Sequence, residues 1–144
     1  MHQVREIRTS LEVGFPDGNL PPKFAVLRGR LSRAISCSPE FPFEDGQFEI
    51  VMMDGSVVSA ASVREAHRVL KPDGELHFIV PEKSGGSDEG FTLPDIYAIV
   101  RSGFNITGLE RPKWWHFGKG ARVFTVCARK KNWRATTGTF RPLV

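Results

Sequence analysis

The sequence has 144 residues and a mass of 16.1 kDa, which is the size of one compact domain and excludes separate cofactor and substrate domains. Hydrophobic residues make up 40% of the chain and charged residues 25%, which excludes a disordered or fibrous protein. The longest apolar runs, such as residues 76–80, are far shorter than the roughly 20 residues that cross a bilayer. The sequence therefore predicts a cytoplasmic protein without a membrane partner.

Charge is distributed unevenly along the chain, although the net charge is only +4. Residues 1–110 hold 11 basic and 16 acidic residues, whereas residues 111–144 hold nine basic residues and no acid. We interpret residues 1–131 as a single domain and residues 132–144 as a polar, basic tail. The basic segment indicates either a nucleic-acid partner or a solvated strand edge whose charges discourage edge-to-edge pairing.

The N-terminal third carries the weakest secondary-structure signals. Residues 9–13 predict a strand that stops at the Gly-Phe-Pro-Asp-Gly sequence beginning at Gly14. The Pro-Pro pair at 21–22 predicts the start of a helix, although residues 24–27 could instead be a strand. Residues 34–37 could form a short strand. The inner face of the predicted helix would carry Phe24, Leu27, Leu31 and Ala34.

The middle of the chain predicts a strand, a helix and a second strand in close succession. Residues 48–53 and 75–80 are short apolar runs: an Asp-Gly pair stands on either side of the first, and Asp73-Gly74 precedes the second. Between them, Ser62 and Glu65 have the spacing of a capping box, and Pro72 is expected to end the helix. So short a connection predicts a right-handed crossover between parallel strands.

The last part of the chain predicts a helix and two strands. Thr92 is a helix cap, with Pro94 in the first turn, and Gly103 stops this helix. Residues 104–109 and 121–128 have the composition of strands.

Two motifs in the second half resemble a known family. Residues 41–51 read Phe-Pro-Phe-Glu-Asp-Gly-Gln-Phe-Glu-Ile-Val, and residues 65–76 read Glu-Ala-His-Arg-Val-Leu-Lys-Pro-Asp-Gly-Glu-Leu. In order and separation they resemble the small-molecule, type 11 group of class I S-adenosylmethionine-dependent methyltransferases, and the likeness extends over residues 9–131. It implies an α/β, Rossmann-like fold of three layers, mostly parallel, with an antiparallel C-terminal strand pair. It also implies S-adenosylmethionine as cofactor and a small-molecule acceptor.

The N-terminal half, which binds the cofactor in that family, departs from the family's pattern. The stretch Leu-Glu-Val-Gly-Phe-Pro-Asp-Gly resembles the glycine-rich first motif, with Gly14 and Gly18 as its outer glycines and Pro16 in place of the middle one. The resemblance calls for an acid that holds the ribose hydroxyls, yet no acid lies between Gly18 and Glu40, so Glu40 is the candidate. Cys37 stands where the family has an acid for the adenine amine.

The N-terminal half is also short. Only 22 residues separate Gly18 from Phe41, too few for the helix, strand, helix and strand that the family has there. We expect one crossover unit to be missing, and with it a wall of the cofactor cleft.

Candidate site residues in the second half lie at strand ends and near tryptophans. Asp54 follows the first clear strand and is a candidate cofactor contact, while His77, Glu82 and His116 are candidates for a general base. His77 could equally be a packed strand residue, and His67 is expected to be an exposed helix residue. The two cysteines, Cys37 and Cys127, lack a paired Cys or His spacing and predict free thiols and no metal site.

Three functions remain open from the sequence. The first is methyl transfer from S-adenosylmethionine to a small molecule, with residues 83–90 and 114–116 as a lid. The second is an inactive, methyltransferase-like interaction module that has lost the donor and binds a protein partner or a second copy as a homodimer. The third is nucleic-acid binding by the basic segment, with bases stacked on Trp114, Trp115 or Trp133.

Overall fold

A six-stranded sheet forms the centre of the computed structural model, which describes residues 8–15, 19–36, 40–83, 89–111 and 122–131. The strands lie in the order β2-β1-β3-β4-β6-β5. The first four of these run parallel, while β6 is antiparallel to both β4 and β5. In chain order the elements are β1 (Thr9–Val13), α1 (Pro22–Ala25), β2 (Leu31–Ile35), β3 (Phe48–Asp54), the 3-10 turn η2 (Gly55–Val57), α2 (Ala60–Val69), β4 (Leu70–Pro81), α3 (Leu93–Val100), β5 (Phe104–Glu110) and β6 (Val123–Lys130).

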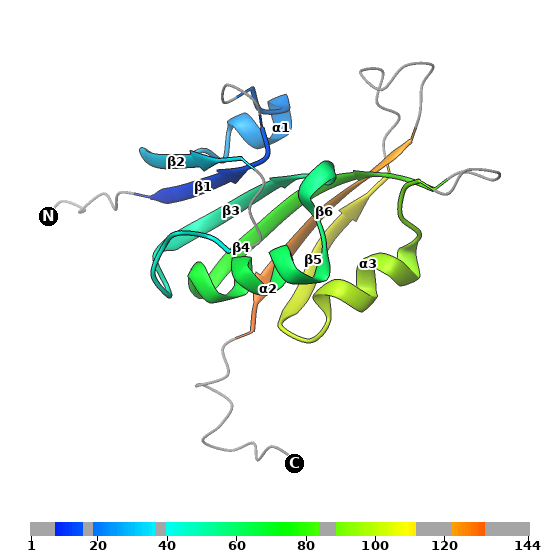
Figure 1. Ribbon diagram of the computed structural model, residues 1–144. Helices are drawn as coiled ribbons and strands as arrows, with labels where there is room; N and C mark the ends of the chain where they lie inside the picture. The colour runs from blue at the N-terminus through cyan, green and yellow to red at the C-terminus, as the bar shows by residue number, and fades with distance from the viewer. Residues whose placement is uncertain (1–7, 16–18, 37–39, 84–88, 112–121, 132–144) are drawn as a thin grey trace, which may run out of the picture.

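Helices cover the two faces of the sheet unequally (Figure 1). α2 and α3 lie together on one face, and the single turn of α1 lies on the other, where Phe24 packs against His77 of β4. This is the predicted Rossmann-like arrangement of three layers with an antiparallel C-terminal pair. Between β1 and Phe41 the described residues form one helix and one strand instead of two of each, so the N-terminal half is shortened as expected.

Alternation along the strands divides the apolar residues between two cores. Leu76, Phe78 and Val80 on β4 are fully buried in the larger core, which lies under α2 and α3. The smaller core lies on the α1 face, where Phe24 packs on the sheet and is 1% exposed. Its other buried members are Phe15, Ile50, Met52, Ile79 and Val123.

The start of α2 differs from the prediction. Ser59, not Ser62, is the N-cap: its hydroxyl accepts the amide of Ser62 at 3.1 Å, and the Ser62 hydroxyl accepts the amide of Ser59 at 2.9 Å. The predicted Ser62–Glu65 capping box was therefore wrong by one turn. The helix also ends at Val69, before Pro72, which lies within β4. For α3, Thr92 is the cap as predicted.

The predicted helix from residue 22 onward was largely wrong. Only Pro22–Ala25 is helical, and Leu31 lies in β2, which pairs in parallel with β1. Gly29 makes the change of direction possible, because a Cβ there would lie 2.4 Å from the carbonyl oxygen of Arg8. The apolar residues whose spacing suggested one helix are therefore divided between the one-turn helix α1 and the edge strand β2. The short strand expected at 34–37 overlaps β2.

Candidate functional site

Three predicted site residues lie at or after the carboxyl ends of the parallel strands. Gly14 follows β1, Asp54 ends β3 and Glu82 follows β4. A Cβ placed on Gly14 would lie 3.3 Å from Cβ of Asp54, so the ends of β1 and β3 are in contact. Ligands of open α/β sheets bind at such an edge.

Gly14 has the backbone conformation of a turn glycine. Its φ is +86°, and its amide donates to the carbonyl of Ile35 at 2.9 Å, which ties the end of β1 to the end of β2. The two methyl carbons of Val57 lie 2.9 and 3.1 Å from the position of a Gly14 Cβ. A side chain at this position would therefore be strained and would also collide with η2.

Asp54 caps the turn that follows β3. Its Oδ2 accepts the amide of Ser56 at 3.0 Å and the hydroxyl of Ser56 at 2.5 Å. Both bonds go to the same oxygen. Within the described part of the chain, Oδ1 is thus the acceptor that remains for a ligand.

Glu82 is held by Arg111 at the same edge. Nη2 of Arg111 donates to Oε2 at 2.5 Å, while its guanidinium lies 5.5 Å from the ring centre of Phe124. The other carboxylate oxygen, Oε1, is buried and has no hydrogen-bond partner among the described residues. A buried acceptor without a donor is costly, so Oε1 is an unsatisfied polar atom of the described structure.

The remaining predicted residues lie elsewhere. Glu40 is exposed, shortly after β2 and directly before the turn that begins at Phe41. Gly18, Cys37 and His116 lie outside the described residues, as do most of the predicted lid and the tail 132–144.

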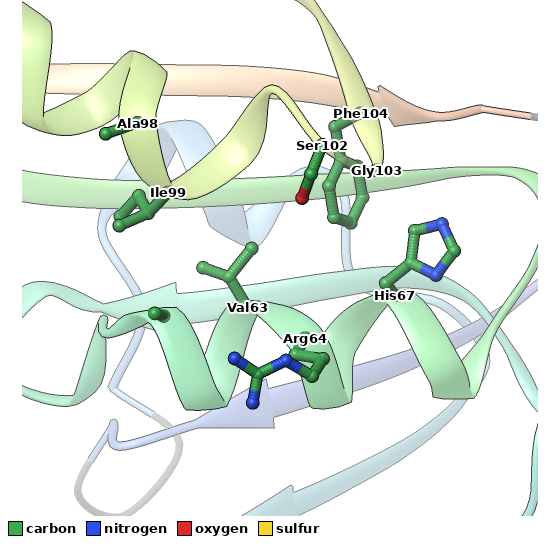
Figure 2. A pocket seen from close by; sticks show the side chains of 9 residues that line it. Val63, Arg64, His67, Ala98, Ile99, Ser102, Gly103 and Phe104 are labelled. Atoms are coloured by element: carbon green, nitrogen blue, oxygen red, sulfur yellow. The ribbon is translucent and has the colours of Figure 1, made fainter. Parts of the chain in front are cut away.

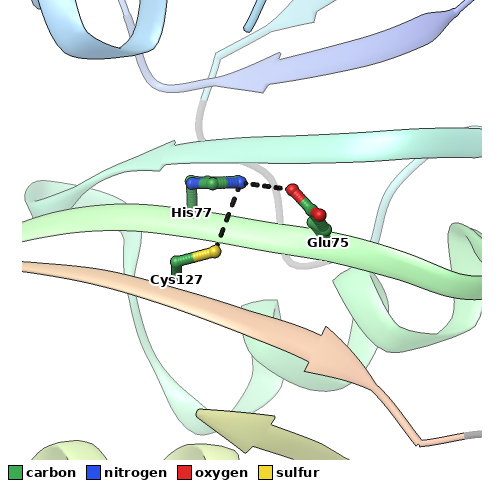
Figure 3. A group of neighbouring side chains, drawn as sticks. All are labelled: Glu75, His77 and Cys127. Atoms are coloured by element: carbon green, nitrogen blue, oxygen red, sulfur yellow. Dashed lines mark hydrogen bonds and ion pairs between the residues drawn. The ribbon is translucent and has the colours of Figure 1, made fainter. Parts of the chain in front are cut away.

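His77 lies in the middle of β4, on the α1 face of the sheet, with two partners that the sequence did not suggest. Its Nε2 is 3.0 Å from Oε1 of Glu75 and 3.6 Å from Sγ of Cys127 (Figure 3). Glu75 shares this face because it is two residues away on the same strand, and Cys127 is the residue of β6 paired with His77. The alternation of Glu75 and His77 could have been noticed in the sequence, but not the register of β6.

Hydrogen bonding shifts the protonation equilibria of this group. Burial favours the neutral forms of His77 and Cys127, but their mutual hydrogen bond and those of His77 with Glu75 and of Cys127 with Thr107 outweigh it. As a result the pKa of His77 is raised and the pKa of Cys127 is lowered. Both shifts favour a thiolate beside an imidazolium.

A pocket of about 200 Å³ opens beside His77 and Cys127. Phe24 forms an apolar wall, with its ring centre 6.1 Å from that of His77 in an edge-on arrangement. The hydroxyl oxygen of Thr125 in this pocket is buried and has no hydrogen-bond partner within the described ranges. The other lining residues are Lys23, Leu27, Gly108 and Glu110.

A second groove, of about 330 Å³, separates α2 from α3 (Figure 2). Val63 on α2 and Ile99 on α3 face one another across it. His67 was expected to be exposed, but it is half-buried against Phe104 and Gly103, and burial lowers its pKa. This groove contains none of the predicted site residues.

Four side chains of the basic segment contact the fold itself: Arg111 binds Glu82, Arg129 binds Glu75, Lys130 donates to the carbonyl of Leu70, and Lys131 donates to the carbonyl of Arg101. Arg129 and Lys130 lie on β6, which is flanked by β4 and β5, so they do not lie on an exposed strand edge. The three tryptophans at 114, 115 and 133 lie outside the described residues.

No helix in the described residues is long and apolar enough to span a membrane. No protein-family model matches the sequence, and no curated protein matches it.

Several solved structures share the fold at low sequence identity. An S-adenosylmethionine-dependent methyltransferase from Methanosarcina mazei is 14% identical, with a TM-score of 0.68 over 89% of this chain and 94% of that chain. The 1,6-didemethyltoxoflavin-N1-methyltransferase of Burkholderia thailandensis, solved with 1,6-didemethyltoxoflavin and S-adenosylhomocysteine, is 19% identical, with a TM-score of 0.61 over 85% and 71% of the two chains.

The cyclase SpnF is similar to the same degree: 15% identity and a TM-score of 0.65 over 86% of this chain and 74% of that chain. One fold thus serves more than one reaction, and likeness of fold does not assign the chemistry. What the strand order, the antiparallel C-terminal pair and these neighbours establish together is that the chain has the fold of class I S-adenosylmethionine-dependent methyltransferases.

Proposed function

We propose that the protein transfers a methyl group from S-adenosylmethionine to a small-molecule acceptor, with the donor bound at the edge formed by Gly14, Asp54 and Glu82. The observation that carries the proposal is the left-handed turn at Gly14, directly after a buried strand and in contact with the end of β3. In this fold, that is where a tight turn brings backbone close to a ligand.

The residues at this edge fit a cationic donor. S-adenosylmethionine carries a sulfonium and an ammonium group, and the edge offers Oδ1 of Asp54 as an anionic acceptor. We assign the ammonium group to Asp54. Glu40 remains the proposed partner of the ribose hydroxyls, since it follows β2 and no other acid lies between Gly18 and that position.

When bound, the donor would supply an electrophilic methyl group. The contribution of the chain is to orient the donor and to accept a proton from the acceptor. Of the three predicted bases, Glu82 is the one described at this edge, and Arg111 fixes its orientation. We therefore propose Glu82 as the general base.

Calorimetric titration with S-adenosylhomocysteine tests the donor site. Wild type should bind, and Asp54→Asn should weaken binding by about tenfold, the effect of losing one charge-assisted hydrogen bond. Asparagine caps helical turns as well as aspartate does, so this variant retains η2. Glu44→Gln, at an exposed carboxylate before β3, is the matched control and should bind like wild type. No heat from wild type at millimolar ligand would refute the proposal.

One observation favours the donor-free interaction module as the second candidate. β2 lies at the edge of the described sheet, four of its five residues are exposed, and Leu31 is 58% exposed. An exposed edge strand has unpaired backbone groups that are suited to pairing with another chain. A concentration-dependent dimer in light scattering, broken by Leu31→Lys, together with no response to S-adenosylhomocysteine, would favour this function over methyl transfer.

A further inference from the structure

Three metal-binding atoms converge on one point of the α1 face. Oε1 of Glu75, Nε2 of His77 and Sγ of Cys127 all lie within 4.8 Å of one another. Figure 3 shows that the contacts of Glu75 and Cys127 both end at the same ring nitrogen. That nitrogen has at most one proton to share between the carboxylate and the sulfur. A cation bound by all three atoms would satisfy each of them.

We propose that Glu75, His77 and Cys127 form a binding site for a divalent transition metal, with Zn²⁺ as the expected ion. Thiolate, imidazole and carboxylate are the ligand types that zinc takes in proteins. The sulfur–nitrogen separation also fits. Typical zinc bond lengths in a tetrahedron put sulfur and nitrogen about 3.5 Å apart, and Sγ of Cys127 lies 3.6 Å from Nε2 of His77.

Neighbouring groups hold two of the three ligands in place. β5 and β6 shift register between Ile106 and Gly108, and this bulge turns Thr107 toward Cys127, where its hydroxyl lies 3.2 Å from Sγ. On the other side, Nη2 of Arg129 is 3.6 Å from Oε2 of Glu75, which leaves Oε1 directed at His77. Such outer contacts are typical of metal sites, where they orient the ligands.

The pocket beside His77 leaves room for a fourth ligand. The ligand set is three protein atoms, which is the number that open, reactive zinc sites have, whereas closed structural sites have four. The 200 Å³ pocket adjoins His77 and Cys127, and the unpartnered hydroxyl of Thr125 lines it. We therefore expect the metal to carry water or a small anionic ligand on this side, next to the apolar wall of Phe24.

This site does not depend on the proposed methyl transfer, because its ligands lie within β4 and β6 and the donor residues lie at the strand ends. Removal of the metal should leave the binding of S-adenosylhomocysteine unchanged. A failure of donor binding would leave the metal proposal intact, and the reverse also holds.

Metal titration of the chelator-stripped full chain tests the proposal. Wild type should bind one equivalent of Zn²⁺ in competition with a chromophoric chelator, and Co²⁺ should give a thiolate-to-metal absorption band. Cys127→Ser and His77→Gln should each weaken Zn²⁺ binding by about 100-fold or more, and Cys127→Ser should abolish the band. Cys37→Ser, which removes the other cysteine, should keep both the affinity and the band.

Thr107→Val provides a milder variant that retains all three ligands. It should bind Zn²⁺ about tenfold more weakly and shift the Co²⁺ band, because it removes only the hydroxyl that contacts Sγ. If Cys127→Ser does not fold, Thr107→Val and Glu75→Gln decide the matter by the same two readouts. Wild type that binds no stoichiometric Zn²⁺, or a Cys127→Ser variant that binds it as tightly as wild type, would overturn the proposal.

Discussion

Arg68 and Glu65 form a bidentate ion pair on α2, with Nε to Oε2 at 3.0 Å and Nη2 to Oε1 at 2.8 Å. The same guanidinium donates to the carbonyl oxygens of Phe41 and Phe43, and Oε1 of Glu65 accepts the amide of Phe41. The two sequence motifs that resemble the methyltransferase family are therefore one hydrogen-bonded unit. They fix how the turn at 41–43 sits on α2, and they stabilise the fold without touching the proposed donor site.

Removal of this guanidinium should destabilise the protein. Arg68→Ala leaves two backbone carbonyls and the carboxylates of Glu65 and Asp45 without this donor, which we expect to lower the free energy of unfolding by about 2–3 kcal/mol. Arg68→Lys keeps the charge but not the planar fork, and should lose about 1 kcal/mol. Urea denaturation measures both. Arg64→Ala, at an exposed position on the same helix, should stay within about 0.5 kcal/mol of wild type.

The pH dependence of stability should carry a contribution from Glu65. Hydrogen bonds from Arg68, together with the Phe41 amide, outweigh burial and lower the pKa of Glu65 below its ordinary value of 4.5. A carboxyl group with a lowered pKa in the folded state stabilises the fold above its unfolded value and loses that contribution as the pH falls through the folded value. Wild-type stability should therefore fall steadily below pH 4.5.

Glu65→Gln tests this linkage in urea unfolding at a series of pH values. The variant should be less stable than wild type at neutral pH, and its stability should fall less steeply below the ordinary glutamate pKa. Asp95, whose pKa is also lowered, by its hydrogen bonds with Thr92, keeps part of the acid dependence. Glu44→Gln should reproduce the wild-type slope. An unchanged slope in Glu65→Gln would contradict the assignment.

Alanine substitutions at two glycines with positive φ distinguish the cost of backbone strain from the cost of a steric collision. Gly46→Ala should cost about 1 kcal/mol, because its φ is +64° and nothing lies within 4 Å of an added Cβ. Gly14→Ala should cost about 1–3 kcal/mol more, since its φ is +86° and Val57 lies 2.9 Å from the new carbon. Thermal unfolding of the two variants, and of Gly14→Ala with Val57→Ala, measures the difference. Equal losses of stability in the two alanine variants would show that η2 moves away from the new Cβ at no cost.

The buried carboxylate of Glu12 depends on Arg28. Glu12 is 3% exposed, and Arg28 donates to both of its oxygens, at 2.6 and 3.0 Å. Arg28→Ala leaves this charge unpaired and should cost about 3 kcal/mol. Combining it with Glu12→Gln should recover part of the loss, because the neutral amide is less costly to bury. A double-mutant cycle in urea measures the coupling, and strict additivity would rule it out.

The best-predicted elements are those whose signals are local. β3 is a short apolar run between two Asp-Gly pairs, and α3 starts at a threonine whose capping partner, Asp95, is three residues away. Each of these signals consists of residues that are close together in the sequence, so the sequence alone contains it. β4 was expected from residue 75, but it begins at Leu70 and runs through Asp73-Gly74. The cap of α2 was misplaced because Ser59 and Ser62 are both suitable, and only the fold decides between them.

The N-terminal third was harder because its structure is set by distant partners. β2 exists because residues 31–35 pair with β1, and its backbone hydrogen bonds replace those of the predicted helix. A four-residue helix such as α1 is too short to be stable by itself, since helix nucleation is costly. It is held by Phe24, which is buried against the sheet.

The sequence by itself determined the class of fold, through two motifs that prove to be one hydrogen-bonded unit, and it placed Gly14, Asp54 and Glu82 at strand ends. The tertiary structure alone decided that Glu75, His77 and Cys127 meet. Glu75 and His77 share a face by the two-residue period of a strand, but Cys127 lies 50 residues from His77 and reaches it through the antiparallel register of β6 on β4. Register depends on packing along the whole sheet, so no local pattern in the sequence contains it.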